Sequence, residues 1–450
     1  MTQVSEAIAR YHKLIESEPY IDLGWAHALQ ERMKAEKLGN RPISPVLRPH
    51  FVTTRQYATL VKAAEALFSS ISRVEQMALA NPSLLARMQL LPAERMLAAV
   101  DPGYSSFSVT GLLDSNLNNG SLRFVSHEAD ASAGVVYGDT LSELFYDAPP
   151  VKEFRKKYKL TKLGVTKYLL QALLKAYKEF GGKQKKPHIA IVEYRPPFQS
   201  AELSEYALLA EFFTREGFPT QIVSPDHLEY RGGILRQGEF NIDIVYRRIK
   251  LHEFLVRFDL GHPLVRAYKD RAVCMVNSFR SELGAKKAIF DLLTDDNVTS
   301  KFPAAEKRAI KEFIPWTRMV QAAKTTYHGR TVDLPDFVMK HRSKLVLKPN
   351  DGSADLNAVR GADTDEMGWE KALRQAMRTP YVVQEMSEPA RAVFPLMQYG
   401  SLVMKDMQVD VHPHSFLGKV HGCSSWLSVA GSNSFSTLTG LAPTFLLEGK

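Results

Sequence analysis

The chain has 450 residues, a length at which a single hydrophobic core has stopped growing, so two or three packed subdomains are expected. With 45% hydrophobic and 24% charged residues, the composition is that of an ordinary globular protein. The sequence shows neither a signal-peptide pattern nor an apolar run of the roughly 18 residues that a membrane span needs. Two cysteines argue against a secreted disulfide scaffold. We therefore expect a cytoplasmic protein that does not enter a membrane.

The net charge of +9 is concentrated in one segment. Residues 152–186 hold twelve Lys or Arg residues and two Glu, which leaves the rest of the chain close to neutral. Val165, Leu169 and Leu173 recur there at helical spacing, so we predict one basic amphipathic helix over 151–186. A solvated face is the ordinary explanation of its charge, and docking of an acidic partner is the alternative. Nucleic acid is not an expected partner, because interleaved aromatics and a known reader module are missing from the sequence.

Residues 1–150 are predicted to be largely helical, with one helix through Leu60 and Val74 that Thr53 or Thr54 caps. The end of this region has a different pattern. Asn118, Asn119 and Gly120 separate two short apolar runs, 108–113 and 122–125, and this arrangement predicts a β-hairpin.

The remainder of the chain predicts two further subdomains. Residues 187–300 alternate apolar strands with helices, which indicates a parallel sheet covered by helices. Its expected strands are 188–192, 220–223, 242–246 and 272–276. Residues 301–450 contain apolar strands at 345–348 and 381–385 and an alternating segment at 402–411, a mixed α+β pattern. The fold class predicted for the whole chain is therefore α/β and α+β.

Several polar residues stand where strands end. Lys348 closes an apolar strand just before a turn, where its ammonium can pair with a phosphate as a point charge. A surface lysine beside a turn is the alternative. Gln384 and Glu385 end a second strand, and they are equally consistent with contacts to an adenine edge and a ribose or with contacts to water.

The expected hairpin ends in Ser126, Glu128 and Asp130, which alternation places on one face. Carboxylates in this arrangement can hold a magnesium ion that bridges phosphates, and a solvated turn is the alternative. His412 and His414 have no further ligands at fixed spacing, which argues against zinc. The sequence contains no Gly-x-Ser-x-Gly or Gly-x-Gly-x-x-Gly motif, which excludes the hydrolase and dinucleotide-binding interpretations that depend on them.

Taken together, these segments resemble the circularly permuted ATP-grasp proteins, a family similar to the synthetase domain of glutathionylspermidine synthase. The resemblance covers nearly the whole chain. The segments that carry it are 189–195, 208–217, 228–231, 243–248, 252–255, 262–268, 277–280, 287–290, 315–318, 347–351 and 382–385.

The resemblance implies a permuted ATP-grasp fold with a pre-ATP-grasp parallel-sheet subdomain, a helical N-terminal region and the nucleotide-binding half in 301–450. In it, the metal-binding strands have moved ahead of the lysine-bearing half. It implies ATP and Mg²⁺ as cofactors and amide formation between a small carboxylate and an amine through an acyl phosphate. Catalytic roles fall to Lys348, Lys287 and Arg280, and ATP contacts to Lys287, Lys348, Gln384 and Glu385. Glu128, Asp130 and, in one alignment, Asp114 would hold the metal.

Four arginines lie in or near strand ends of the expected parallel sheet, where open α/β sheets bind ligands. They are Arg195, Arg247, Arg248 and Arg280. A guanidinium grips a carboxylate with two parallel hydrogen bonds, so these residues are candidates for holding the substrate acid. Structural ion pairs are the alternative.

The sequence also departs from the family's pattern. Ser126 stands where the family has a metal-binding Glu, and the upstream acidic ligand aligns with Thr110 or Asp114. The loop 352–359 lacks most of the glycines that fold over the phosphates in relatives. A second hypothesis is therefore a catalytically inactive homologue that binds a ligand or a protein partner.

Overall fold

The computed structural model describes residues 3–36, 43–118, 121–129, 134–194, 205–351, 358–429 and 440–449. Asp130 and Arg195, and residues 352–357 of the expected phosphate loop, lie outside these ranges. In the ranges described, no helix is both long enough and apolar enough to cross a membrane.

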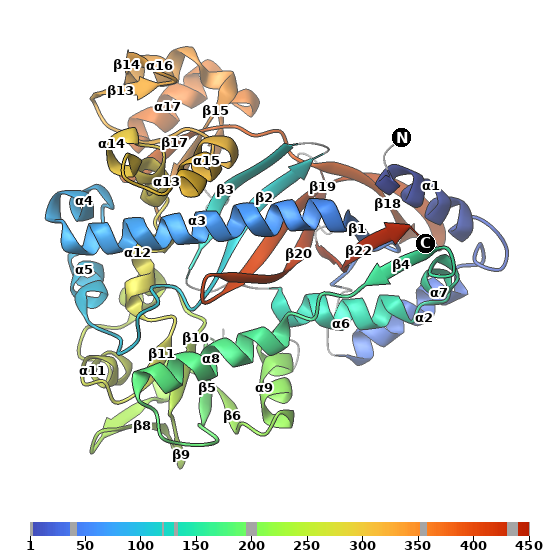
Figure 1. Ribbon diagram of the computed structural model, residues 1–450, viewed down its shortest axis with the longest axis horizontal. Coiled ribbons are helices and arrows are strands. Elements are labelled where there is room, and N and C mark those ends of the chain that lie inside the picture. Colours follow the sequence, from blue (N-terminus) through green and yellow to red (C-terminus); the bar gives the residue numbers. More distant parts are fainter. Residues whose placement is uncertain are drawn as a thin grey trace.

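A large antiparallel sheet forms the centre of the molecule and joins distant parts of the sequence (Figure 1). Its strands follow the order β21-β20-β19-β2-β3, and β18 also pairs with β19. The hairpin predicted near residue 119 is confirmed as β2 and β3. The strands are β2 (Thr110–Asn118), β3 (Ser121–Glu128), β18 (Arg391–Gln398), β19 (Ser401–Phe416), β20 (Lys419–Val429) and β21 (Gly440–Ala442).

The long helix α3 (Thr54–Ala80) crosses one face of this sheet (Figure 1). Thr53 caps it, as predicted: its hydroxyl accepts a hydrogen bond from the Gln56 amide. The main apolar core lies between α3, the sheet and the helices near residue 290. The helices of this region are α4 (Pro82–Arg87), α5 (Pro92–Ala99), α12 (Glu282–Ala285), α13 (Ala288–Leu293), α14 (Asp296–Thr299) and α15 (Ala304–Phe313).

The parallel sheet predicted for 187–300 is confirmed, with the order β11-β10-β5-β6. Helices cover both of its faces, so its strands are buried and continuously apolar. The strands are β5 (Ile189–Val192), β6 (Thr220–Val223), β10 (Ile244–Arg247) and β11 (Cys274–Val276); the helices are α8 (Thr166–Phe180), α9 (Glu205–Arg215), α10 (Leu251–Arg257) and α11 (Pro263–Lys269). A small sheet of β7 (Glu229–Arg231), β8 (Ile234–Gln237) and β9 (Phe240–Asn241) flanks it. One boundary differs from expectation, because residues 283–293 pack in the core beneath α3.

The basic segment 151–186 was predicted as one helix, and this prediction is wrong. It contains the end of α7 (Pro149–Phe154), then β4 (Tyr158–Thr161), then α8. Strand β4 pairs with β22 (Thr444–Gly449), which also pairs with β1 (His50–Thr53). Only α8 is the expected amphipathic helix, with Leu169 and Leu173 buried. The helices α1 (Gln3–Ile15), α2 (Gly24–Ala35) and α6 (Val135–Tyr146) pack nearby.

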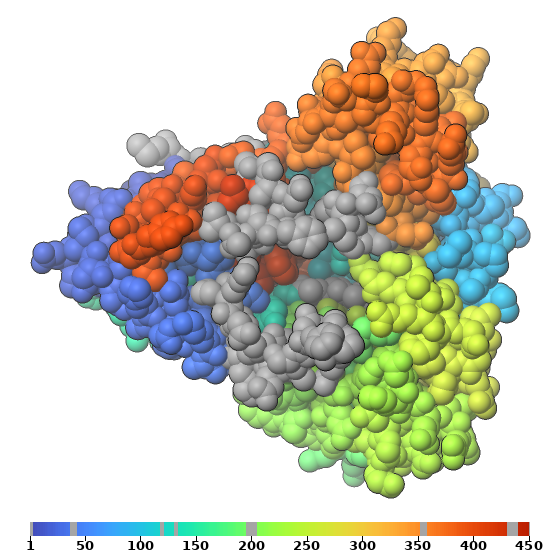
Figure 2. All heavy atoms as spheres, turned by 180° about the vertical axis from the view of Figure 1, so that it is seen from behind, coloured from blue at the N-terminus to red at the C-terminus, as the bar shows by residue number. Residues whose placement is uncertain are grey.

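Residues 301–450 also form more than one unit. A separate apolar core holds a small lobe around the antiparallel sheet β12-β17-β15-β16, whereas β18 to β20 belong to the central sheet. The lobe contains β12 (Thr317–Met319), β13 (Lys324–Tyr327), β14 (Arg330–Asp333), α16 (Leu334–Lys340), β15 (Leu345–Pro349), β16 (Val359–Arg360), α17 (Glu366–Ala376) and β17 (Tyr381–Glu385). Seen from behind, this orange lobe, the yellow-green parallel-sheet part and the blue N-terminal part meet around a hollow (Figure 2).

Candidate functional site

Lys348 lies where the small lobe meets the central sheet. It is 8% exposed, and its Nζ donates to Gln384 Oε1 at 2.9 Å and to the Val125 carbonyl at 3.2 Å. Gln384, on the neighbouring strand β17, also donates from Nε2 to Thr317 Oγ1 at 2.9 Å. The alternative of a surface lysine is therefore excluded. The ammonium bridges a strand of the lobe and the hairpin predicted to bind metal.

An irregularity in the hairpin decides which of its side chains share a face. Asp114 pairs with Ser126 but Ser115 pairs with Phe124, so Val125 is an extra residue in β3. Directly opposed residues share a face, and the register therefore places Asp114, Ser126 and Glu128 on one face, with His127 on the other. The shared face predicted for Ser126 and Glu128 is confirmed, and Asp114 joins it.

The predicted metal ligands are not gathered into a complete set in the part of the chain that is described. Asp114 Oδ1 lies 3.3 Å from His412 Nε2, an ion pair only when the imidazole is protonated. Glu128 lies in a small cavity of about 20 Å³ that Lys287 also lines. The role of Glu128 and Asp114 in holding a magnesium ion stays a prediction.

Lys287, the second predicted phosphate lysine, is 3% exposed. Its backbone amide donates to the Asn350 carbonyl at 3.0 Å, and the next amide, of Ala288, donates to Asn350 Oδ1 at 2.9 Å. Asn350 follows Lys348 by two residues and is fully buried. This contact ties the helix α13 that begins after Lys287 to the end of the strand that carries Lys348.

The neighbouring Lys286 was not predicted, and it is more deeply buried than Lys287. Its Nζ lies 2.8 Å from Glu94 Oε2 and 3.0 Å from Glu282 Oε1, and it also bonds Asp351. Although burial by itself lowers the pKa of Lys286, the three carboxylates raise it above its ordinary value. In the described ranges these carboxylates are the one group of three potential metal ligands. The Lys286 ammonium is already bound among these three carboxylates as their cation.

Glu385 contacts the hairpin formed by β13 and β14 of the lobe. Its Oε1 accepts from the Tyr327 hydroxyl at 2.6 Å and contacts His328 Nε2 at 3.1 Å, and its Oε2 accepts from the Trp316 amide at 3.3 Å. These contacts orient the carboxylate at the end of β17. The predicted contact of Glu385 with ribose stays a prediction.

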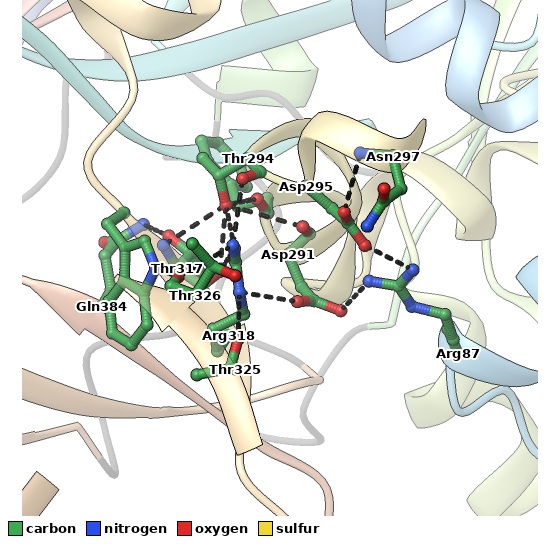
Figure 3. Close-up of polar contacts among 12 residues, drawn as sticks. Arg87, Asp291, Thr294, Asp295, Asn297, Thr317, Arg318, Thr325, Thr326 and Gln384 are labelled. Atoms are coloured by element: carbon green, nitrogen blue, oxygen red, sulfur yellow. Dashed lines mark hydrogen bonds and ion pairs between the residues drawn. The ribbon is translucent and has the colours of Figure 1, made fainter. Parts of the chain in front are cut away.

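A polar network at the base of the lobe connects it with α4 and α13 (Figure 3). Arg318 donates to Thr294 Oγ1 at 2.8 Å and to Thr325 Oγ1 at 2.9 Å. Asp291 lies between Arg318 and Arg87, and Arg87 is 3.0 Å from Asp291 Oδ2. Burial raises the pKa of the Asp291 carboxyl, and Arg87 opposes that rise. Thr317 stands at the edge of this network and links it to Gln384.

Two of the predicted arginines bind the protein's own backbone. Arg247 is 1% exposed and donates to the carbonyls of Asn277 at 3.0 Å and Ile249 at 2.5 Å. Arg280 donates to the carbonyls of Ala98 at 3.3 Å and Val100 at 3.1 Å. In the residues described, these guanidinium groups hold loops and helix ends together.

Arg248 has a different environment, at the C-terminal end of the parallel sheet. Its guanidinium lies 5.3 Å from the Tyr246 ring centre and 5.1 Å from that of Tyr206. Burial alone lowers the pKa of Arg248, but Tyr246, Tyr206 and the buried Glu205 raise it above its ordinary value. Glu205 accepts hydrogen bonds from the amides of Gly134 and Val136. Arg248 is thus the predicted substrate arginine with aromatic and acidic neighbours.

The structure therefore joins Lys348 to Gln384 and places Lys287 and Glu128 in the wall of one small cavity, with Asp114 on the same hairpin face as Glu128. Sequence reasoning missed Lys286, Glu94 and Thr317. Two adjacent lysines were visible in the sequence, but nothing local indicates which of them is surrounded by acids from three segments.

Searches of protein-family models and of curated proteins find no match for this chain. Among solved structures, the chain is similar to a glutathione synthetase-like effector from Globodera pallida in its apo form, with 13% identity and a TM-score of 0.58 over 96% of this chain and 98% of that one. A putative gamma-glutamylcysteine synthetase from Methylobacillus flagellatus KT aligns at 10% identity and a TM-score of 0.43, over 88% and 87% of the two chains. The first similarity shows a shared fold and no more.

Proposed function

We propose that this chain binds ATP with Mg²⁺ on a permuted ATP-grasp-like fold and joins a carboxylate to an amine. The observation that carries the proposal is the buried Lys348 ammonium, which lies between the β15–β17 sheet and the hairpin bearing Glu128 and Asp114. A γ-phosphate at this junction would meet a cation from the lobe and metal-binding carboxylates from the hairpin. The fold shared with a glutathione synthetase-like protein supports this choice of reaction.

In the proposed reaction, a carboxylate oxygen of the substrate attacks the γ-phosphorus and ADP leaves. The amine nitrogen then attacks the acyl phosphate carbon, phosphate leaves and the nitrogen loses a proton. Lys348 and Lys287 would stabilise negative charge on the transferring group, which is usually the largest catalytic contribution. Two of the acceptors that Lys348 contacts are neutral oxygens, and a phosphate oxygen is a stronger acceptor than either. Gln384 would hold Lys348 in position. We propose Arg248, with Arg195, to bind the substrate carboxylate.

A second candidate is a nucleotide-binding protein without ligase activity that serves a protein partner. The observation that favours it is the reduced metal set of the described hairpin. Ser126 stands opposite Asp114, and Asp114 itself contacts His412. If this set cannot hold Mg²⁺ against the phosphates, binding persists without phosphoryl transfer, because each lost electrostatic contact costs on the order of 10²-fold in rate.

Calorimetric titration with a non-hydrolysable ATP analogue, with and without Mg²⁺, tests nucleotide binding. We expect Lys348→Ala to weaken binding by about ten-fold or more, since a charge-assisted hydrogen bond to phosphate is lost. Lys371→Ala, which removes an exposed lysine on α17 of the same lobe, should leave binding unchanged. Absence of binding by the folded wild-type protein would contradict both candidates.

Phosphate release separates the two candidates. With ATP, Mg²⁺ and a panel of amino acids and short peptides as acids and amines, a ligase releases phosphate only when both substrates are present. A protein that binds the analogue but releases no phosphate with any pair supports the second candidate.

A further inference from the structure

A cavity of about 410 Å³ lies between α3 and the central sheet, on the face opposite Asp114 and Glu128. Its walls come from α3, from the loop at 106–108 and from the ends of β2, β3, β19 and β20. In Figure 1 this is the side on which α3 crosses in front of the sheet. The volume lies within the range of sites that bind small organic molecules.

Glu75 of α3 lines this cavity and is 1% exposed. Its Oε1 finds no hydrogen-bond partner in the described part of the chain. A buried polar atom left in this state is destabilising, so a carboxyl here needs a compensating donor. Burial raises the pKa of Glu75 well above its usual range, and a nearby positive charge would oppose that rise.

His127 of β3 lines the same cavity beside Glu75. Its Nδ1 lies 2.9 Å from the Gly284 carbonyl, which can only accept, so Nδ1 carries a proton. In the neutral ring Nε2 is then an acceptor. A methyl group placed on Gly284 would lie 2.3 Å from Glu75 Oε1 and 3.1 Å from His127 Cε1. The carboxyl oxygen of Glu75 and the imidazole of His127 therefore lie next to each other against Gly284.

The cations at the rim of the cavity are already paired. Arg73 Nε lies 3.0 Å from Glu306 Oε2, and Lys419 Nζ lies 3.0 Å from Glu65 Oε2. Glu306 and Glu65 therefore hold Arg73 and Lys419 at the rim of the cavity, so these two cations do not pair with Glu75. The remaining lining is rich in serine hydroxyls, which can form hydrogen bonds with a polar ligand.

We propose that this cavity is a second ligand site, separate from the nucleotide junction, that takes a small organic molecule carrying a primary ammonium group. The ammonium would bind Glu75, since an ion pair with a donor satisfies the buried oxygen. Serine hydroxyls along α3 and the 106–108 loop would bind the polar remainder. This inference does not depend on the proposed ligase activity.

Calorimetry with two matched probes, 1,4-diaminobutane and the neutral 1,4-butanediol, tests the proposal. We expect the wild-type protein to bind the diamine at least about ten-fold more tightly than the diol, the difference a charged hydrogen bond makes. Glu75→Gln keeps the shape of the site and should abolish this preference. Glu312→Gln, at an exposed acid on α15, should not change it.

Ser72→Phe provides an independent variant, because Ser72 lies on the cavity wall and is half-buried. The phenyl ring should fill the cavity and remove binding of the diamine while the thermal unfolding curve stays cooperative. If the wild-type protein does not bind the diamine at a concentration of about 10 mM, its affinity is too low for a specific site and the proposal is overturned. Equal binding of the two probes, or diamine binding that survives both Glu75→Gln and Ser72→Phe, overturns it as well.

Discussion

Single buried charges in this protein are held by acids or carbonyls from segments far apart in the sequence. Lys286 shows this most clearly, since Glu94 comes from α5, Glu282 from α12 and Asp351 from the end of β15. The contacts join the core beneath α3 with the small lobe. At this scale, stability depends on matching each buried charge rather than on the number of ion pairs.

Replacing Lys286 with methionine should therefore be strongly destabilising. The change leaves three carboxylates without their cation, and breaking a buried pair in this way costs about 3–5 kcal/mol. Urea unfolding followed by circular dichroism measures the loss. The matched Lys371→Met variant changes an exposed lysine and should stay within about 0.5 kcal/mol of wild type. Equal losses in the two variants would show that the buried cation contributes nothing particular.

Among the elements, α3 organises the largest part of the molecule, because it contacts both the central sheet and the helices near residue 290. Its first turn is closed by a reciprocal pair of hydrogen bonds. The Gln56 amide donates to Thr53 Oγ1 at 3.1 Å, and the Thr53 amide donates to Gln56 Oε1 at 3.0 Å. This capping box satisfies two backbone donors that the helix itself cannot.

We expect Thr53→Ala to destabilise the protein by about 1 kcal/mol, the usual value of a lost helix cap. Thr59→Ala is the control, since the Thr59 hydroxyl only donates to the Arg55 carbonyl within the same helix. Thermal unfolding of both variants should show a clear decrease for Thr53→Ala and a smaller change for Thr59→Ala. Equal shifts would mean that the cap has no separate role.

Across the whole molecule, β1 near the N-terminus pairs with β22 near the C-terminus, and β4 completes that small sheet. His50 begins β1 and is half-buried, with Nδ1 2.7 Å from Ser425 Oγ. Burial, assisted by Arg48, lowers the pKa of His50 from 6.5 to about 3. His50 therefore binds a proton less readily in the folded protein than in the unfolded chain.

The stability linked to His50 is fully present above pH 6.5 and decreases as the pH falls toward about 3. In that window the unfolded state binds the extra proton, so the free energy of unfolding should fall by about 1.4 kcal/mol per pH unit. His50→Asn should remove this part of the slope. Urea unfolding of both proteins between about pH 6 and pH 4 measures it, and the buried acids that titrate in the opposite sense are common to both. Parallel curves would contradict the assignment.

The sequence determined what local periodicity and composition encode. The helix α3, the buried parallel strands and the burial of α8 along Leu169 and Leu173 follow from the spacing of apolar residues. The Thr53 cap and the β2–β3 hairpin follow from the residue types at the ends of those elements. Apolar spacing shows which face of a helix or strand is buried, whichever element of the fold packs against that face. The lysine at the end of β15 was recognisable for the same reason, because an apolar strand ending in Lys348 was visible in the chain.

Only the tertiary structure decided which distant segments meet. The pairing of β4 with β22 divided the expected basic helix, and the pairing of β19 with β2 placed Asp114 beside His412. Arg247 donates to backbone carbonyls, and Lys286 is enclosed by three acids. Hydrogen-bonding groups carry no sequence mark of their partners, since any carbonyl or carboxylate can satisfy a given cation. The cavity at Glu75 likewise exists only because α3 crosses the sheet, which is why no pattern in the sequence pointed to it.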